Sequence, residues 1–376
     1  MTRFFKMNLN AICILLLIVD SGGGLMLRPV SFLIMIFYAI KSLQKDKIST
    51  KFLIPYLLFI LSLLPSLVIA LLNNIDIATI FSWIFAYLCI PMFYFYVKGS
   101  DLKVEDYIKA GGCFAALVVV LFFGRILQVP FVIAVNEFIE SRSNGFFGSK
   151  NFLSGEVWPN VYFQGTLSLI ICGALCIPYK FYWTFCLILI SLVLAPSRFG
   201  VIVLVMWLLF LFFKTSYKRF LWIPFILIIG MFILENFAFG KEILALFNGE
   251  SDGGTIRLGH LSSVINEFGS SPLNMLFGFG PGSEFYSAGF QEMATNIEIS
   301  QLEFIRKYGL ISFLFFMVFY FRTVLVKDQE IYFLNGALFL YFLVAFSNPV
   351  LSSLFLFLFL MFTYIKAFEP KNCYYE

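Results

Sequence analysis

The sequence predicts an all-α integral membrane protein with about twelve transmembrane helices. Composition and patterning both support this class. The chain of 376 residues is 61% hydrophobic and only 13% charged, and 51 of its residues are phenylalanine. Long apolar runs alternate with short charged breaks, which is typical of membrane-spanning helices. No polar stretch is long enough to form a soluble domain, so residues 1–376 are expected to form a single polytopic membrane domain.

The apolar runs give the expected helices in chain order. The first run follows Arg3 and Lys6, and the next begins so soon after it that we expect an uncleaved helix, not a secretory signal. An even number of spans places both termini on the same side of the membrane. The expected spans cover residues 8–20, 25–41, 52–72, 78–97, 107–124, 159–178, 181–195, 199–213, 220–238, 303–321, 331–346 and 350–367.

The run between Lys180 and Lys214 is too long for a single crossing. Its 33 residues would extend about 50 Å as a helix, against a hydrocarbon core of roughly 30 Å. Basic residues flank the run at both ends, and basic flanks indicate the cytoplasmic side. The run is therefore expected to form a helical hairpin, with Arg198, its only charged residue, at the outer tip.

The basic residues orient the expected helices. Of the 26 lysines and arginines, seventeen fall on one side and nine, including Arg306 and Lys307, on the other. Because lysine and arginine accumulate on the cytoplasmic side, both termini are expected in the cytoplasm. The net charge of +4 does not indicate a nucleic-acid partner, since the basic residues are dispersed between apolar runs and form no basic face.

This topology leaves two long outer loops, 125–158 and 239–302. Loops of this length usually bind, gate or catalyse, so function is sought there. In the second loop, GGTIRLGHLSSVINEF has Thr255 positioned to cap a helix, followed by apolar residues at helical spacing. We expect an amphipathic helix lying on the membrane surface. Its apolar stripe consists of Leu258, Leu261, Ile265 and Phe268.

Each expected outer segment around the presumed site, the two long loops and the hairpin tip, offers an arginine: Arg142, Arg198 and Arg257. A guanidinium binds oxyanions through two parallel hydrogen bonds and tolerates partial desolvation better than an ammonium. Several arginines together therefore suit a phosphate or diphosphate at membrane depth. The alternative for each one is an interfacial side chain that extends toward the lipid headgroups.

His260 is the only histidine, and it lies three residues after Arg257 on the same face of the expected helix. It is either a packing and hydrogen-bonding residue or an acid–base group. The glycine-rich sequence GFGPGS, residues 278–283, suggests a phosphate-binding loop, but no strand precedes it. We expect a turn that re-enters the membrane region.

Three acids could accept a proton on the outer side. Glu303 and Lys307 are spaced i,i+4 and are expected to pair, which leaves Glu298 as the freer acid. Asp20, in VDSGGG, either caps a turn or acts as a base. Neither a CxxC motif nor a DxD pair in the outer loops is present, so no metal site is expected.

Three segments together resemble the O-antigen polymerase (Wzy) and O-antigen ligase superfamily of bacterial glycosyltransferases. They are SRFG at a hairpin tip, an arginine-bearing outer loop before WPNVYFQG, and the run from TIRLGH through PLNMLFGFGPGSEF to LEFIRKYGLISFL. The resemblance covers mainly residues 140–315. It implies a GT-C-like fold and a cofactor-independent and metal-independent enzyme of the bacterial inner membrane, with its active site facing the periplasm.

The resemblance also implies roles for the residues singled out. Arg142, Arg198 and Arg257 would hold a diphosphate. In the ligases, a pattern like HNxYLxxLxExG ends at a glycine that begins a span, and the same offset from Gly309 places Glu298 where the histidine stands. This departure favours a polymerase, with Glu298 as the catalytic base. Secondary site candidates are His260, Asn160, Gln164 and Glu303.

The expected activity is transfer of a glycan from undecaprenyl diphosphate to the non-reducing end of another lipid-linked repeat unit, with inversion. A carboxylate can accept the proton of the attacking hydroxyl, and guanidiniums can stabilise the leaving diphosphate. Expected partners are lipid-linked oligosaccharides as donor and acceptor, membrane lipid and a chain-length regulator protein. The alternatives are a ligase that acts on lipid A-core and, in another class, a transporter or flippase for the lipid-linked sugar.

Overall fold

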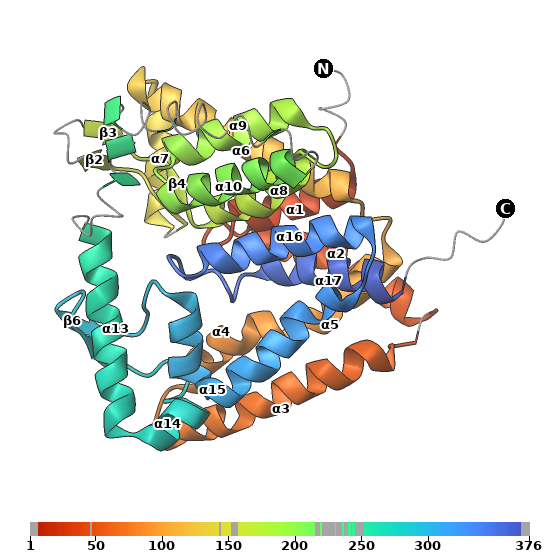
Figure 1. Ribbon diagram of the computed structural model, residues 1–376, viewed down its shortest axis with the longest axis vertical. Helices are drawn as coiled ribbons and strands as arrows, with labels where there is room; N and C mark the ends of the chain where they lie inside the picture. The colour runs from red at the N-terminus through yellow and green to blue at the C-terminus, as the bar shows by residue number, and fades with distance from the viewer. Residues whose placement is uncertain are drawn as a thin grey trace. The chain divides into compact units, whose positions relative to one another are not determined.

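A computed structural model of the chain describes residues 7–45, 47–142, 144–151, 157–214 and 252–369, with isolated positions between 219 and 244. The chain divides into two compact units. The first consists of residues 1–34, 101–251 and 336–344, and the second of residues 35–100, 252–335 and 345–376. Helices α2 (Leu27–Leu43) and α16 (Gln329–Val344) belong partly to each unit (Figure 1).

The first unit is built around α6 (Val104–Ile126). Gly111 of α6 faces the side chain of Cys172, and Gly173 faces Leu204, so these glycines allow close contact between helices. Helix α8 (Leu169–Cys176) packs on α6, and every one of its residues is buried. The helices that pack around this pair are α1 (Leu9–Val19), α7 (Pro130–Ser141), α9 (Tyr182–Leu194) and α10 (Arg198–Lys214).

Two short antiparallel strand pairs lie between α7 and α8. They pair β1 (Gly145–Phe146) with β4 (Tyr162–Phe163), and β2 (Ser149–Asn151) with β3 (Val157–Pro159). The expected helix over 159–178 is therefore wrong in its first part: the 3₁₀ turn η1 begins only at Gln164 and leads into α8. VWPNVYF is rich in β-branched and aromatic residues, which favour extended backbone.

The second unit pairs α3 (Thr50–Leu72) with α15 (Ser300–Phe321), which lie along each other, and α5 with α17 (Figure 1). An aromatic core joins these helices and gives a structural use to the many phenylalanines. Phe59 stacks on Phe319 at 6.1 Å, and Phe304 stacks on Phe316 at 5.1 Å. The remaining elements are α4 (Ile77–Leu88), α5 (Ile90–Gly99), α13 (Asp252–Ser270), α14 (Pro272–Phe277), β5 (Phe285–Ser287), β6 (Glu292–Ala294), η3 (Arg322–Leu325) and α17 (Leu354–Phe368).

Helix α15 is broken at Gly309, whose φ of 85° and ψ of 162° are not helical. A positive φ in this range is readily adopted by glycine alone. The break leaves the carbonyls of the preceding turn without their helical donors. Phe279 N donates to Arg306 O at 2.8 Å and Gly280 N to Lys307 O at 3.1 Å, so the glycine-rich loop satisfies these carbonyls.

Within the described residues, four helical segments are long and apolar enough to cross a membrane. This supports a mostly helical membrane protein, and the full count of twelve spans stays a prediction. The expected span 220–238 lies outside the described residues, apart from isolated positions. The four segments are Thr50–Leu72, Ile77–Gly99, Val104–Ile126 and Ser300–Leu325.

Several expected elements are confirmed and one is corrected. The hairpin around Arg198 is confirmed, because α9 and α10 pack together and are joined by a short turn. The span expected over 78–97 is present as the segment Ile77–Gly99, which is interrupted only at Cys89, between α4 and α5, because Pro91 cannot donate a helical hydrogen bond. Thr255 is not the cap of the amphipathic helix, since α13 already begins at Asp252.

Candidate functional site

The residues singled out from the sequence fall in both units. Arg142, Arg198, Asn160 and Gln164 belong to the first unit, and Arg257, His260, Glu298 and Glu303 to the second. The expected convergence of the three arginines therefore stays a prediction. Within the second unit, the structure brings Arg257 and Glu298 into contact.

In the first unit, both arginines stand at helix ends. Arg142 follows the last residue of α7, is exposed, and lies over the Phe138 ring at 5.5 Å. Arg198 is the first residue of α10 and is half-buried. The side-chain oxygen of the half-buried Asn160 is buried and has no hydrogen-bond partner within the described residues, whereas Gln164 is exposed.

Asp20 caps a turn and does not serve as a free base. Its carboxylate is buried and accepts hydrogen bonds from the backbone amides of Leu25, Leu27 and Arg28 at 2.8–3.0 Å. These amides precede or begin α2, and an anionic acceptor at a helix N-terminus is stabilising. The capping interpretation of Asp20 is thereby confirmed.

An ion pair in the second unit joins Arg257 and Glu298. Arg257 Nε lies 3.0 Å from Glu298 Oε2, with 27% and 34% of the two side chains exposed. The angles at this pair do not satisfy hydrogen-bond geometry. Arg257 Nη2 also donates to Ser347 O at 3.2 Å, and Nη1 has no acceptor within the described residues. Arg257 can therefore accept an anionic ligand. Glu298 is ion-paired, but it is freer than Glu303, as expected, because Glu303 has two cationic partners and is only 10% exposed.

Ser300 anchors the segment that carries Glu298. Its hydroxyl donates to Asn348 O at 2.6 Å and accepts from Val350 N at 2.6 Å, and its amide donates to Ala345 O at 2.9 Å. These bonds attach the start of α15 to the connection between α16 and α17. Since Arg257 binds the carbonyl of the adjacent Ser347, the same connection also orients the arginine.

His260 lies one turn beyond Arg257 in α13, on the same face as expected, and is fully buried. Nδ1 is 2.7 Å from Ser287 Oγ, which accepts from Phe290 N at 3.1 Å. The serine proton has no other acceptor within the described residues, so we assign the hydroxyl as donor to Nδ1, which places the proton of the neutral ring on Nε2. Burial lowers the pKa of His260, partly opposed by the nearby Glu298 and Glu303 carboxylates.

Nε2 of His260 is buried and has no hydrogen-bond partner within the described part of the chain. A buried donor without an acceptor costs roughly 1–3 kcal/mol. Arg257 and Glu298 are partly exposed, His260 beside them is buried, and all three have unused hydrogen-bonding capacity within the described residues; we call them the open cluster.

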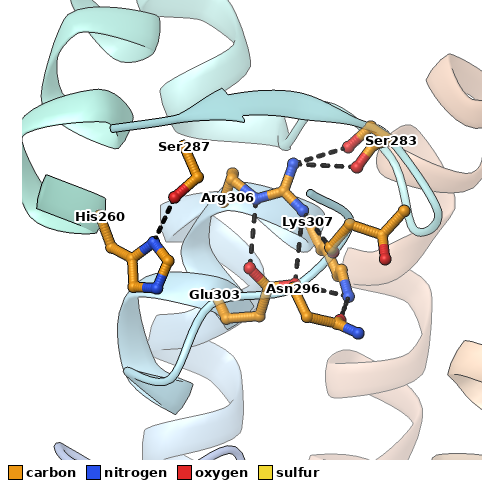
Figure 2. Close-up of polar contacts among 8 residues, drawn as sticks. His260, Ser283, Ser287, Asn296, Glu303, Arg306 and Lys307 are labelled. Atoms are coloured by element: carbon orange, nitrogen blue, oxygen red, sulfur yellow. Dashed lines mark hydrogen bonds and ion pairs between the residues drawn. The ribbon is translucent and has the colours of Figure 1, made fainter. Parts of the chain in front are cut away.

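A second group, the closed cluster, consists of Glu303, Arg306 and Lys307 (Figure 2). Arg306 is fully buried and makes five hydrogen bonds, to both carboxylate oxygens of Glu303, to Ser283 O and Oγ, and to Thr295 O. These bonds fasten the loop before and after the β5–β6 hairpin to α15. The closed cluster is therefore a structural clasp.

Lys307 completes the closed cluster. Its ammonium lies 2.5 Å from Glu303 Oε1, donates to Asn296 Oδ1 at 2.8 Å and stands 3.0 Å from the centre of the Trp83 ring. The expected pairing of Glu303 with Lys307 is confirmed. Both basic residues are expected on the outer side at the start of the span 303–321, and the structure buries them within the start of α15.

The glycine-rich loop is not a phosphate cradle. Gly278, Gly280 and Gly282 all have positive φ, and the amides of Phe279 and Gly280 are already bound to carbonyls of α15. The loop instead caps the break at Gly309. The expected return of this turn toward a membrane-spanning helix agrees with its contact with α15.

Sequence reasoning missed Arg306 and Glu267. The spacing of EFIRK, with cations three and four residues after Glu303, would have indicated that both basic side chains can reach this carboxylate. Glu267, in α13, has a buried carboxylate oxygen without a partner in the described residues, and burial raises its pKa. No motif marked Glu267, because its environment arises from distant segments.

Comparisons with known proteins add no relative to these observations. No family model, no curated protein and no solved structure matches the chain.

Proposed function

We propose that this chain is a polymerase of surface polysaccharide, with a GT-C-like arrangement of about twelve spans in the bacterial inner membrane. It transfers a glycan from undecaprenyl diphosphate to the non-reducing end of another lipid-linked repeat unit. The observation that supports this most directly is the Arg257–Glu298 pair, at 3.0 Å. It unites a residue suited to the leaving diphosphate with one suited to the attacking hydroxyl.

In the proposed reaction, Glu298 accepts the proton of the acceptor hydroxyl while that oxygen attacks the anomeric carbon. The bond from this carbon to the diphosphate oxygen breaks with inversion, and the diphosphate leaves with the electron pair. Arg257, together with Arg142 and Arg198, stabilises its charge. An arginine with open donors and a partly exposed carboxylate is the minimum that this chemistry requires.

A transporter or flippase for the same lipid-linked sugar is the second candidate, and the break of α15 at Gly309 is the observation that favours it. Interrupted helices commonly hold ions or substrates through free backbone groups. Here two of the carbonyls released by the break, those of Arg306 and Lys307, are already bound by loop amides. The break therefore leaves fewer free backbone carbonyls for a transported ion than such a site usually has. This favours the enzyme over the transporter.

The test is whether the purified protein, reconstituted in lipid with a chelator, lengthens an undecaprenyl-diphosphate-linked repeat unit. Polymer without added metal is the expected product. Transfer that occurs only when lipid A-core is supplied would identify a ligase, and translocation of an unchanged lipid-linked sugar would identify a transporter. Either result would overturn the proposal that the chain is a polymerase.

The orientation is tested by reporter fusions. Fusions at Lys47 and Lys103 should report the cytoplasm, and fusions at Lys150 and Gly253 should report the periplasm. A reversed result at either long loop would remove the proposed site from the face where the lipid-linked substrates are used.

A further inference from the structure

The open cluster contains a buried hydrogen-bond donor that the proposed reaction does not yet use. His260 Nε2 has no acceptor within the described residues, although the ring is fully buried and held by Ser287. Figure 2 shows Nε2 on the edge of the ring turned away from Ser287. The serine fixes the tautomer, so this edge presents an N–H and needs an acceptor.

Glu298 is the acceptor that the surroundings offer. Its carboxylate lies 3.0 Å from Arg257, which stands one helical turn before His260 in α13, and the negative charges of Glu298 and Glu303 both oppose the lowering of the His260 pKa by burial. Glu303 is occupied by Arg306 and Lys307. Within the described residues Glu298 pairs with Arg257 alone, and its side chain is 34% exposed. It is therefore the carboxylate free to change its contact.

We propose that His260 is a positioning residue for Glu298: when an anion occupies Arg257, the Glu298 carboxylate leaves the guanidinium and accepts a hydrogen bond from His260 Nε2. This inference rests on the proposed function, since it supplies a step that the Arg257–Glu298 pair alone lacks. A carboxylate held by a guanidinium accepts a proton less readily than one held by a neutral donor. The exchange thus couples diphosphate binding to release of the base.

The geometry of α13 supports such an exchange. Arg257 and His260 are three residues apart in α13, a spacing that places them on the same helical face, and the Glu298 carboxylate already lies 3.0 Å from Arg257. The exchange requires this carboxylate to pass from one side chain to its neighbour one turn along the helix. The segment that carries Glu298 is fixed at Ser300, and the histidine is fixed at Ser287. Only the Glu298 side chain needs to move.

Because the chain contains a single histidine, nitrogen-15 labelling of histidine reports on His260 alone. The measurement is solid-state NMR of the full-length protein in lipid bilayers, with and without inorganic pyrophosphate at matched ionic strength. We expect the Nε2–H tautomer before addition and a change in the Nε2 shift after it. The Arg257→Ala and Glu298→Ala variants should show no change. An unchanged Nε2 shift in the wild-type protein overturns the proposal.

Two substitutions extend the test to turnover. Asn places its amide near the Nδ1 position and Gln near the Nε2 position, so His260→Asn keeps the bond to Ser287 and His260→Gln keeps the donor toward Glu298. We expect His260→Asn to lose about 10- to 100-fold in kcat with KM nearly unchanged, as for a misplaced catalytic group. His260→Gln should stay within about threefold of the wild type.

The two variants also separate folding from positioning. Equal activity of His260→Asn and the wild type would overturn the proposal and make His260 a packing residue. Loss of activity in both variants, together with lowered thermal stability, would also overturn the proposal and make His260 a packing residue. If the wild-type protein makes no polymer, the proposed function fails. The pyrophosphate-dependent NMR change still tests whether the Glu298 carboxylate moves from Arg257 to His260.

Discussion

The closed and open clusters lie in the same unit, and they differ in how completely their charges are satisfied. In the closed cluster, 10% of the Glu303 side chain is exposed, and Arg306 and Lys307 are almost fully buried, with every contact made inside the protein. In the open cluster, the Arg257 and Glu298 side chains are 27% and 34% exposed, and the buried His260 Nε2 has no partner in the part of the chain that the structure describes.

This difference separates structural from functional charge. A buried ion pair is stable only when its remaining donors and acceptors are also satisfied, and the closed cluster meets this condition. Unpaired polar groups are retained where a ligand or a moving side chain will use them. The comparison therefore assigns stability to Arg306 and supports the chemistry proposed for Arg257 and Glu298.

The largest effect is expected from breaking the closed cluster. Arg306→Met removes five hydrogen bonds and leaves Glu303 with Lys307 alone, so the free energy of unfolding should fall by about 3–5 kcal/mol. The measurement is thermal and denaturant unfolding of the detergent-solubilised protein. Arg142→Met, at an exposed arginine, is the control and should change stability by less than about 1 kcal/mol. Equal losses of stability in the two variants would contradict the role of the closed cluster as a structural clasp.

A matched pair of isosteric changes sharpens the comparison. Glu298→Gln cannot accept a proton and should lose about 10²-fold or more of turnover, with unfolding nearly unchanged. Glu303→Gln leaves two buried cations without their anion, so its main effect should be on stability. Both variants are assayed for polymer formation and for unfolding. An active Glu298→Gln protein would move the base elsewhere, and Glu267 would be the next carboxylate to test.

The arginines of the first unit test whether that unit contributes to the same chemistry. Arg198→Ala and Arg142→Ala should each abolish polymer formation while the amount of protein in the membrane stays near normal. Lysine should rescue poorly at both positions, because an ammonium lacks the planar pair of donors. Immunoblotting and polymer analysis of the same cells measure both quantities. Full activity in either alanine variant would return that arginine to an interfacial role.

The smallest expected effect is a pH dependence from His260. Burial lowers the pKa of this histidine below its ordinary value of 6.5, so the folded state favours the neutral ring. Its contribution to stability should be present above pH 6.5 and should be lost as the pH falls through the lowered value. As the pH is lowered through this window, the unfolding midpoint of the wild type should fall, and that of His260→Gln should fall less. The same slope in both proteins would assign the acid sensitivity to groups other than His260.

Local patterning predicted much of the helical fold. The hairpin around Arg198 follows from run length and flanking charge, and the pairing of Glu303 with Lys307 follows from their spacing. The errors arose where extended and helical backbone compete, as in VWPNVYF, whose aromatic and β-branched residues form β3 and β4 ahead of α8. Pro91 and Gly309 then divide segments that hydropathy alone presents as continuous.

By itself, the sequence determined the membrane class, the order of the apolar helices and the candidate charges, because these depend on composition and on neighbours within a few residues. Only the tertiary structure decided which charges are satisfied. Glu298 meets Arg257 and Nδ1 of His260 meets Ser287 through packing of segments distant in the chain. Since the energy of a charge depends on its partners and its burial, the same residue types become a clasp in one cluster and a candidate reactive site in the other.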